Sequence, residues 1–463
     1  MVLIYFDGVV MGAGKSRQTG TSGRAKVVIV GGGFGGLYAA RGLADAPVDL
    51  VLIDRQNHHC FQPLLYQVAT AALSPADVAW PIRGILSDQK NATVLLDTVT
   101  GIDTARRVVE TAETSIPYDH LILATGSTHS YFGNDDWAEA APGLKRIEDA
   151  TEIRRRILLA FEKAELARDE ERRRRLLTFV VVGGGPTGVE IAGAIRDMAR
   201  HTLAADFRNI DAGAARVLIV EAGPRILPAF NDTLAGYAKK ALERMGVEVL
   251  TETKVIGCDA GGVDTEGGRI EAGTIIWAAG VVASPAGVWL QAPMQKNGQV
   301  RVAEDLSVPG VPDVYAIGDT AFVLQQDEKP VPGIAPAAKQ MGSYVAKLLS
   351  ARVSGRPLPG PFVYRHRGDL ATIGRKSAIV QLRRMRLTGV SAWLFWGAVH
   401  VFFLIGTRNR VAVAYKWMWD YLTLQRGARL ITEPAQPRTR VEPAEEERRE
   451  EEKATRLGTR SAD

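Results

Sequence analysis

One glycine-rich stretch near the start of the chain most constrains what this sequence can fold into. Residues 27–30, Val-Val-Ile-Val, have the composition of a short buried strand, and residues 37–43 continue as a helical pattern. Between them Gly31, Gly33 and Gly36 stand at G-x-G-x-x-G spacing. In this motif the first glycine makes a tight turn, the second lets a pyrophosphate approach the backbone, and the third packs the helix against the strand. The stretch therefore predicts a phosphate-binding turn at a helix N-terminus.

A second stretch repeats this design about 150 residues later, where an apolar strand pattern runs into Gly183, Gly185 and Gly188. Each unit is followed by a strand that ends in a carboxylate, Asp54 after the first and Glu221 after the second. A carboxylate at this place suits ribose hydroxyls, so the chain is expected to bind two dinucleotides on two domains. Because Glu221 would repel a 2′-phosphate, we expect NADH to be preferred over NADPH.

Three more apolar strand patterns end in glycine, which lets the backbone lie close to a cofactor or to the next domain. They are residues 118–127, which contain Ala124-Thr125-Gly126, residues 274–281, which contain Ala279-Gly280, and residues 313–319, which end in Gly318-Asp319. A carboxylate beside an accessible glycine, as at Asp319, fits the hydroxyl-rich ribityl chain of a flavin nucleotide.

Length and cysteine content narrow the class of protein. At 463 residues the chain is too long for one ordinary core, so two or three domains are expected. Cys60 and Cys258 are the only cysteines and have no paired spacing, and the adjacent His58 and His59 do not face one metal. We therefore expect no metal site, and we do not expect the chain to be a flavoenzyme that reduces disulfides or oxidises sulfide. The modest net charge of +5 gives no indication of a nucleic-acid partner.

The C-terminal segment concentrates positive charge and tryptophan. Residues 380–430 hold eight basic side chains against the single acid Asp420, a net charge of +7, and four of the eight tryptophans. Such a mixture favours the headgroup region of an anionic membrane. The apolar run at 391–406 is about 16 residues long, short of the roughly 20 needed to span. Monotopic attachment is predicted; a hydrophobic dimer interface or a core-capping helix is the alternative, and a symmetric dimer would allow both.

Taken together, these motifs resemble the two-dinucleotide flavoprotein reductases over about residues 24–340. Finer matches resemble the type II (non-proton-pumping) NADH:quinone oxidoreductases, and extend the resemblance to about residue 432. These matches are Phe61-x-Pro63-Leu-Leu-Tyr66-x-Val-Ala69, Ala335-Pro-Ala-Ala-Lys339-Gln340-Met-Gly342, Thr372-Ile-Gly-Arg-Lys376-Ser-Ala and Leu404-Ile-Gly-Thr-Arg408-Asn409-Arg410. One departure is that many members carry Ala-Gln where this chain has Ala335-Pro336, so a quinone contact of that Gln is not carried over.

The resemblance implies an α/β fold with two Rossmann-like dinucleotide-binding domains, the NADH domain inserted in the FAD domain, and a C-terminal membrane-associating helical segment. The expected boundaries are a disordered leader at 1–23, a discontinuous FAD domain at 24–145 and 290–380, an NADH domain at 146–289, a membrane-anchoring segment at 381–432 and a disordered charged tail at 433–463.

The function implied is transfer of a hydride from NADH to FAD and then of two electrons to a membrane quinone, ubiquinone or menaquinone, without proton pumping. The protein is expected to be a homodimer, peripheral on the cytoplasmic face of the cell inner membrane. Two alternatives share the nucleotide-binding core. One is a soluble flavin reductase that donates electrons to a ferredoxin or another protein, and the other is an NADH-binding flavoprotein with a signalling role.

Two residues are expected to act in the chemistry. Glu190, assigned to the first turn of its helix, is either a carboxylate stabilised by the helix N-terminus or, as the resemblance implies, a group facing flavin and quinone whose pKa is raised by burial. Lys376, assigned to a strand, is either a surface side chain or, by the resemblance, a cation near the flavin. The expected cofactor-binding residues are Gly31, Gly33, Phe34, Gly35, Gly36, Asp54, Arg55, Val99, Ala124, Thr125, Gly126, Gly318, Asp319, Ala335, Gly183, Gly185, Pro186, Thr187, Gly188, Glu221, Ala279 and Gly280.

Overall fold

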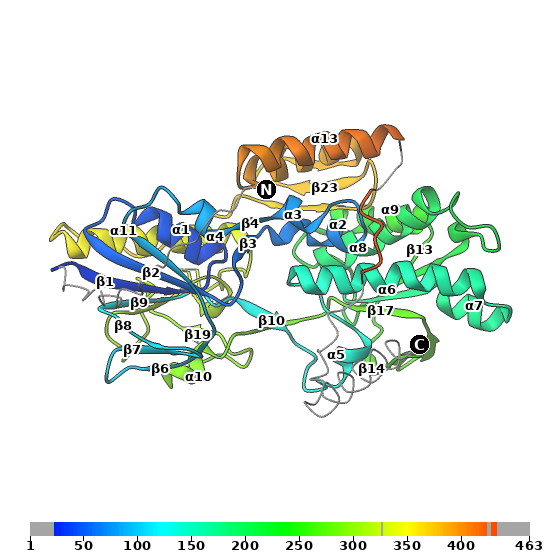
Figure 1. The fold of residues 1–463 in the computed structure, drawn as a ribbon. Coiled ribbons are helices and arrows are strands. Elements are labelled where there is room, and N and C mark those ends of the chain that lie inside the picture. Colours follow the sequence, from blue (N-terminus) through cyan, green and yellow to red (C-terminus); the bar gives the residue numbers. More distant parts are fainter. Residues whose placement is uncertain (1–22, 326, 424–426, 433–463) are drawn as a thin grey trace, which may run out of the picture.

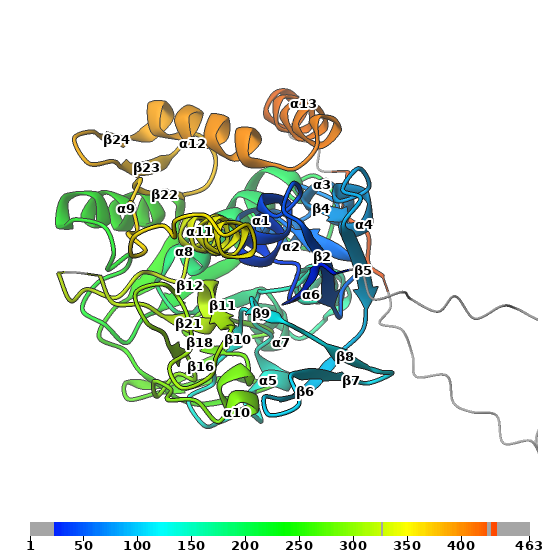
Figure 2. The ribbon, with the colours of Figure 1, turned by 90° about the vertical axis from the view of Figure 1, so that its left-hand side faces the viewer.

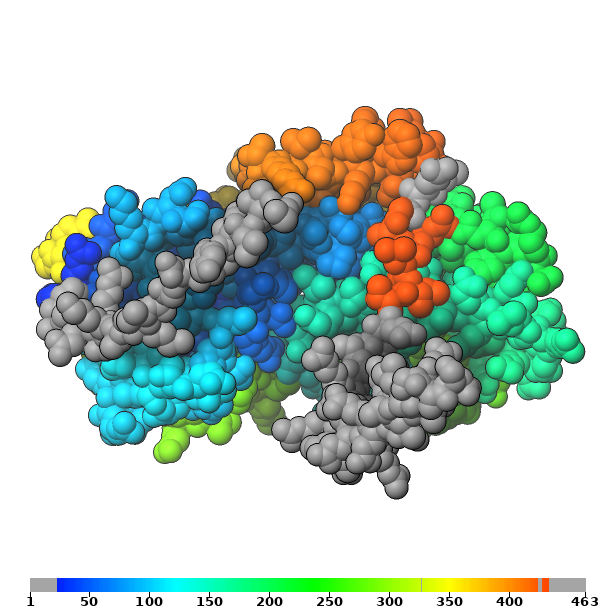
Figure 3. Space-filling model, in the orientation of Figure 1, coloured from blue at the N-terminus to red at the C-terminus, as the bar shows by residue number. Residues whose placement is uncertain are grey.

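The computed structural model describes residues 23–325, 327–423 and 427–432. The predicted tail at 433–463 and all but the last residue of the predicted leader at 1–23 lie outside the described residues. Figure 1 shows two α/β lobes side by side, with the C-terminal helices lying across the top of their junction. Figure 3 shows the same C-terminal segment as a ridge over both lobes.

The first lobe is built on a five-stranded parallel sheet in the order β20-β9-β1-β2-β5. The order of the strands reverses at β1, because β2 and β5 lie on one side of it and β9 and β20 lie on the other. Open α/β sheets bind nucleotides at such a switch point. Helix α11 packs along α1, the helix that follows the first glycine turn. The bounds are β1 Ala25–Val30, α1 Phe34–Gly42, β2 Val48–Asp54, β5 Ala92–Leu96, β9 His120–Leu123, β20 Val314–Ala316 and α11 Ala335–Val353.

The second lobe repeats this architecture on a four-stranded parallel sheet in the order β13-β12-β11-β17. Its strands all fall between β9 and β20 of the first sheet, so this lobe is inserted into the first. The α/β class with two dinucleotide-binding domains is confirmed, whereas the residue boundaries proposed for the domains stay predictions. The bounds are α6 Ile147–Leu166, β11 Thr178–Val182, α8 Pro186–Asp197, β12 Arg216–Val220, α9 Asp232–Met245, β13 Val247–Leu250 and β17 Thr274–Trp277.

A two-stranded antiparallel ribbon joins the lobes, formed by β10 Ser127–His129 and β18 Val281–Ala283. The remaining elements are β3 His58–Cys60, η1 Gln62–Leu64, α2 Leu65–Ala69, α3 Pro75–Val78, β4 Ala79–Pro81, α4 Ile82–Ile85, β6 Val99–Asp103, β7 Val108–Thr111, β8 Ser115–Pro117, α5 Trp137–Ala140, α7 Glu170–Leu176, η2 Met198–Thr202, η3 Ala212–Ala214, β14 Val255–Asp259, β15 Gly262–Thr265, β16 Gly268–Glu271, α10 Ala286–Leu290, β19 Val300–Arg301, η4 Gly318–Thr320, β21 Ala321–Phe322, β22 Asp369–Thr372, β23 Ala378–Gln381, β24 Arg386–Thr388, α12 Gly389–Phe403 and α13 Thr407–Thr423.

The C-terminal segment is part of the body of the protein. The β22–β24 sheet leads into α12, whose Trp396 is 2% exposed in a hydrophobic core shared with the second lobe and α2. An ion pair of 2.5 Å between Lys416 and Asp77 ties α13 to α3. Among residues 23–325, 327–423 and 427–432, no helix has both the length and the apolarity needed to cross a bilayer.

The packing of α11 on α1 gives a test of the fold. A Cβ at Gly342 would lie less than 3.0 Å from the carbonyl oxygen of Gly35, so Gly342→Ala must push the two helices apart. We expect it to lower the free energy of unfolding by about 1–3 kcal/mol. Gly236→Ala in α9 is the control, because a Cβ there meets nothing within 4 Å. Thermal melts in which both variants match the wild type would contradict this packing.

Candidate functional site

The first glycine turn has the geometry that its spacing predicts. Gly31 has φ +105°, and a Cβ on it would overlap the backbone of Ala124, the residue that follows β9. A Cβ on Gly36 would overlap the carbonyl of Gly31. Protein packing alone therefore requires the first and third glycines, because the helix and the neighbouring strand approach the turn too closely for a side chain.

The second turn repeats these contacts. Gly183 has φ +108° and its Cβ would overlap Ala278, while a Cβ on Gly188 would overlap the carbonyl of Gly183. Pro186 is the first residue of α8, where its missing N–H costs no helical hydrogen bond, and Thr187 follows it; both are exposed. The two lobes thus present two equivalent turns.

The middle glycines are different, and the space around them indicates whether dinucleotides fit the two turns. A Cβ on Gly33 or on Gly185 would meet no protein atom within 4 Å, so nothing in the chain itself requires glycine there. Both are N-cap residues of helices that have neither a side-chain cap nor an acid in the first turn. Open space in front of uncapped helix amides fits a pyrophosphate, as the FAD and NADH assignments require.

The two strand-end carboxylates are held in matching positions. Asp54 accepts a hydrogen bond of 2.5 Å from the N–H of Gly32, and Glu221 accepts one of 2.6 Å from the N–H of Gly184. Each carboxylate is thereby fixed to the middle of its glycine turn. Burial raises the pKa of Asp54, and the backbone N–H groups of Gly32 and Gln56 oppose that rise.

The two motifs predicted to flank the flavin meet in the structure. Because β9 pairs with β20, the Ala124-Thr125-Gly126 stretch lies beside Gly318-Asp319. The N–H of Gly126 donates to Thr320 at 2.9 Å, and Ser127 donates to Asp319 at 2.6 Å. The predicted linker motif and the predicted ribityl site therefore form one hydrogen-bonded unit.

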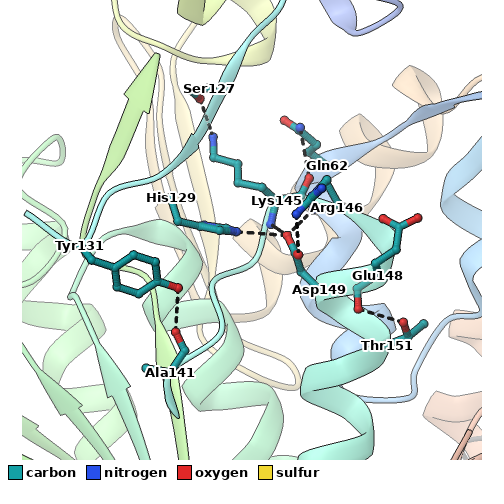
Figure 4. A network of polar contacts seen from close by, with 10 residues as sticks. All are labelled: Gln62, Ser127, His129, Tyr131, Ala141, Lys145, Arg146, Glu148, Asp149 and Thr151. Carbon is teal, nitrogen blue, oxygen red and sulfur yellow. Dashed lines mark hydrogen bonds and ion pairs between the residues drawn. The ribbon is translucent and has the colours of Figure 1, made fainter. Parts of the chain in front are cut away.

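Lys145 is a cation at this unit that the sequence did not reveal. Its Nζ lies 3.1 Å from Ser127 Oγ and 3.6 Å from Asp319 Oδ2. Its backbone N–H donates to Asp149, which also accepts from His129 (Figure 4). No local motif marks this lysine, because its position depends on the start of α6 being docked against the lobe-joining ribbon.

Glu190 is a buried carboxylate without a cationic partner among the described residues. It is 9% exposed, and its one hydrogen bond comes from the N–H of Thr372 at 3.3 Å. Burial raises the pKa of Glu190 to about 8. Placing it in the first helical turn was wrong, because α8 begins at Pro186 and Glu190 is its fifth residue. The helix N-terminus is therefore not the main influence on the pKa of Glu190.

Glu190 lines a cavity of about 750 Å³ between the second lobe and the C-terminal helices. One wall is polar and is held together by side-chain hydrogen bonds. The hydroxyl groups of Tyr66 and Thr372 are hydrogen-bonded to each other. Gln67 donates to Tyr66 and accepts from Trp417. The other walls are mostly apolar. The residues from the C-terminal helices are Val390, Trp393, Leu394, Trp396, Gly397, Ala398, Val401, Ala414, Trp417, Met418, Asp420 and Tyr421.

Lys376 lies near the C-terminal helix α13. The structure places it in the turn between β22 and β23 with φ +67°, so assigning it to a strand was wrong. Its side chain is exposed, and its Nζ lies 5.1 Å from the ring centre of Tyr421. The role expected for it near the flavin stays a prediction.

Lys339 occupies a different environment, enclosed by aromatic rings. Its Nζ lies within 4.5 to 6.0 Å of four ring centres, those of Phe34, Tyr38, Phe61 and Phe403. Burial lowers the pKa of Lys339 to about 8. Cation–π contacts compensate in part for the lost hydration. The sequence motif that begins at Ala335 includes Lys339, but it does not predict that aromatic rings enclose this lysine.

The structure gives the following positions for the remaining predicted residues. Phe34 is buried in the first turn of α1, with Gly35 beside it, and Ala335 begins α11. Arg55 follows β2 and is exposed, and Val99 begins β6. Ala279 and Gly280 follow β17, where a Cβ on Gly280 would meet the ring of Phe132.

The cysteines and possible metal ligands bear on rival chemistries. Cys60 and Cys258 are free thiols, and burial raises their pKa to about 12 and about 11. Neither thiol is therefore an activated nucleophile. In the part of the chain that the structure describes, no group of three or more His, Cys, Asp or Glu side chains is placed to hold a metal ion.

Comparison with known proteins extends over nearly the whole chain. Residues 25–342 match the pyridine nucleotide-disulphide oxidoreductase family, and residues 366–424 match the NDH2 C-terminal domain. The type II NADH:quinone oxidoreductase Ndh of Mycobacterium tuberculosis is 44% identical, with 90% of this chain and 93% of that protein covered. The internal alternative NAD(P)H-ubiquinone oxidoreductase A1 of Arabidopsis thaliana is 31% identical over 86% and 84%.

Solved structures share the fold. NDH2 from Plasmodium falciparum in complex with NADH has a TM-score of 0.80 at 21% identity, covering 89% of this chain and 100% of that one. The sulfide:quinone oxidoreductase of Aquifex aeolicus has a TM-score of 0.66 at 17% identity, covering 89% and 96%.

The carboxylate of Asp54 can be tested for its predicted hold on FAD. Asp54→Ala removes the acceptor for Gly32 and the partner of the ribose hydroxyls, so we expect FAD affinity to fall by about 10- to 100-fold. Asp45→Ala, at an exposed acid, is the matched control. The measurement is flavin absorbance per protein after gel filtration and during titration with FAD. Equal flavin retention in both variants would refute this assignment.

Proposed function

We infer, since this chain belongs to the type II NADH:quinone oxidoreductase family, that it oxidises NADH and reduces a quinone without pumping protons. The observation that carries this function is a cavity lined by the buried acid Glu190, which lies on the helix that follows the second glycine turn. When bound, FAD would supply the electron chemistry between NADH and the quinone.

The chain's own groups position the two nucleotides. The helix amides after Gly33 and Gly185 face open spaces that suit the two pyrophosphates, and Asp54 and Glu221 are proposed to bind the ribose hydroxyls. Asp319, with Lys145 beside it, is proposed to bind the ribityl chain. The contacts of these residues support the proposed roles.

Glu190 is proposed as the proton donor for the quinone. A carboxyl whose pKa is about 8 is protonated at neutral pH and can give its proton to a reduced quinone oxygen. The apolar cavity in which it lies suits a quinone ring and the start of its isoprenoid chain. Pro336 is exposed and does not line this cavity, so the Gln found there in many relatives has no counterpart in it.

The C-terminal helices are proposed to attach the protein to the cytoplasmic face of the inner membrane. Of the large exposed apolar side chains in the part of the chain that the structure describes, more than half lie beyond residue 384, among them Leu394, Phe402 and Met418. The tryptophans contribute less than expected, because Trp396 is buried and Trp417 lines the cavity, while Trp419 is 46% exposed. The same apolar surface suits a homodimer, which would present two such patches to the lipid.

A soluble reductase for ferredoxin is the weaker alternative. Such an enzyme has no use for a large apolar cavity roofed by α12 and α13, whereas a quinone needs one. A purely signalling flavoprotein has no use for a buried, protonated acid in that cavity. These three functions are distinguished by comparing the rate of electron transfer from NADH to a short-chain quinone with the rate of transfer to ferredoxin.

Glu190→Gln tests the proton donor. It removes the acidic proton and preserves size, so quinone reduction should slow by about 100-fold or more while FAD and NADH binding persist. In the wild type, quinone reduction should be constant below pH 8 and fall as pH rises through about 8, because the carboxyl then loses its proton. Glu162→Gln, at an exposed acid of α6, is the control. Turnover of Glu190→Gln equal to the wild type would remove Glu190 from the mechanism.

Glu221→Ala tests the preference for NADH. Without the carboxylate that would repel a 2′-phosphate, the ratio of kcat/KM for NADH over NADPH should fall by about tenfold or more. Glu243→Ala, at an exposed position of α9, changes the net charge equally and should leave the ratio unaltered. Steady-state kinetics with both nucleotides decide, and an unchanged ratio in Glu221→Ala would disprove the role.

A further inference from the structure

A cationic hollow lies on the surface at the β23–β24 hairpin, apart from the cavity that holds Glu190. Its volume is about 490 Å³. The hollow is formed by one hairpin and one residue of the preceding chain segment. Its lining residues are His366, Gln381, Leu382, Arg383, Arg384 and Arg386.

The three arginines of the hollow have no acidic partner among the described residues. Arg383, Arg384 and Arg386 are all exposed. The one acid between residues 362 and 388 is Asp369, and it is already paired with His366 at 3.2 Å. Three guanidinium groups therefore line the same hollow, and no described acidic side chain pairs with them.

The other basic side chains of the C-terminal segment are mostly engaged elsewhere. Lys416 pairs with Asp77, Arg429 pairs with Asp206, and Arg410 donates to the carbonyl of Leu404 at 2.9 Å. Among the described residues, the three arginines at the hairpin are the basic side chains of this segment that share one hollow, while Arg408 and Arg410 are exposed elsewhere in the segment.

The hollow borders the exposed apolar face of α12. Arg386 lies in β24, which leads directly into that helix, and Figure 2 shows β24 beside α12 on the top face of the molecule. Met385, Val390 and Leu394, which flank the hairpin or continue along the helix, are 39%, 54% and 61% exposed. A cluster of cations is therefore continuous with a strip of apolar side chains.

We propose that this hollow binds the phosphate group of an anionic phospholipid, whose acyl chains lie along α12. Guanidinium groups bind phosphate through paired, charge-assisted hydrogen bonds. The adjoining apolar strip favours a lipid over a free phosphate ion, which has no part that would contact Met385 or Val390. This inference rests on the membrane attachment proposed above and names the residues that select the headgroup.

The test compares two triple variants with the wild-type holoenzyme. Arg383→Gln/Arg384→Gln/Arg386→Gln removes the hollow's charge. Arg172→Gln/Arg174→Gln/Arg175→Gln, at exposed positions on or beside the end of α7, removes the same charge far from the C-terminal helices. Flotation with vesicles of phosphatidylcholine alone, or mixed with phosphatidylglycerol, measures lipid binding. NADH oxidation with a water-soluble quinone, without vesicles, checks that each variant is folded and active.

The hollow variant should bind phosphatidylglycerol vesicles about 10-fold or more weakly than the wild type, and the α7 variant should bind them normally. Both should keep wild-type activity with the soluble quinone. Equal losses in both variants would mean that only total charge matters and would overturn the proposal. Normal binding by the hollow variant would overturn it too.

Two further measurements distinguish a lipid phosphate from a free phosphate ion, and separate this inference from the proposed NADH:quinone function. Inorganic phosphate should release the wild type from the vesicles no better than chloride at equal ionic strength; preferential release would identify a free-phosphate site and overturn the lipid assignment. A wild type that floats with neither kind of vesicle refutes this inference together with membrane attachment. The NADH:quinone function is judged separately, by the rate with the soluble quinone.

Discussion

The rest of the structure depends on how closely two helices approach the strands that precede them. At Gly31 and Gly183 the neighbouring strand leaves no space for a Cβ, and at Gly36 and Gly188 the turn itself leaves none. This contact aims uncapped helix amides at open space and brings a carboxylate onto each turn. Two nucleotide sites of the same geometry follow, and inserting one lobe into the other places both beside the ribbon that joins them.

The second constraint is the burial of Glu190, an acid that has no counter-charge among the described residues. An ionised carboxylate in this position would be costly, and the structure resolves the conflict by favouring the protonated form of Glu190. Such a group holds a proton at neutral pH in a cavity whose lining is mostly apolar. The α12–α13 roof that makes the cavity apolar is also the surface proposed to contact the membrane, so catalysis and attachment share one structural element.

Local patterns carried most of the prediction, and tertiary contacts account for what was missed. The glycine turns and the carboxylates Asp54 and Glu221 were predictable because each depends on a strand, a turn and a helix adjacent in sequence. Lys145 was not, since its contact with Asp319 depends on how the lobes dock. Which basic side chains stay free was equally hidden, because the partners of Lys416 and Arg429 lie in distant parts of the chain.

The central claim is that NADH and a quinone react in turn at one bound flavin. Anaerobic stopped-flow spectroscopy of the purified protein tests it most directly. Adding NADH should bleach the flavin absorbance, and adding a short-chain quinone should restore it at a rate that supports steady-state turnover. A flavin that NADH does not bleach, or that ferredoxin reoxidises while the quinone does not, would contradict the account.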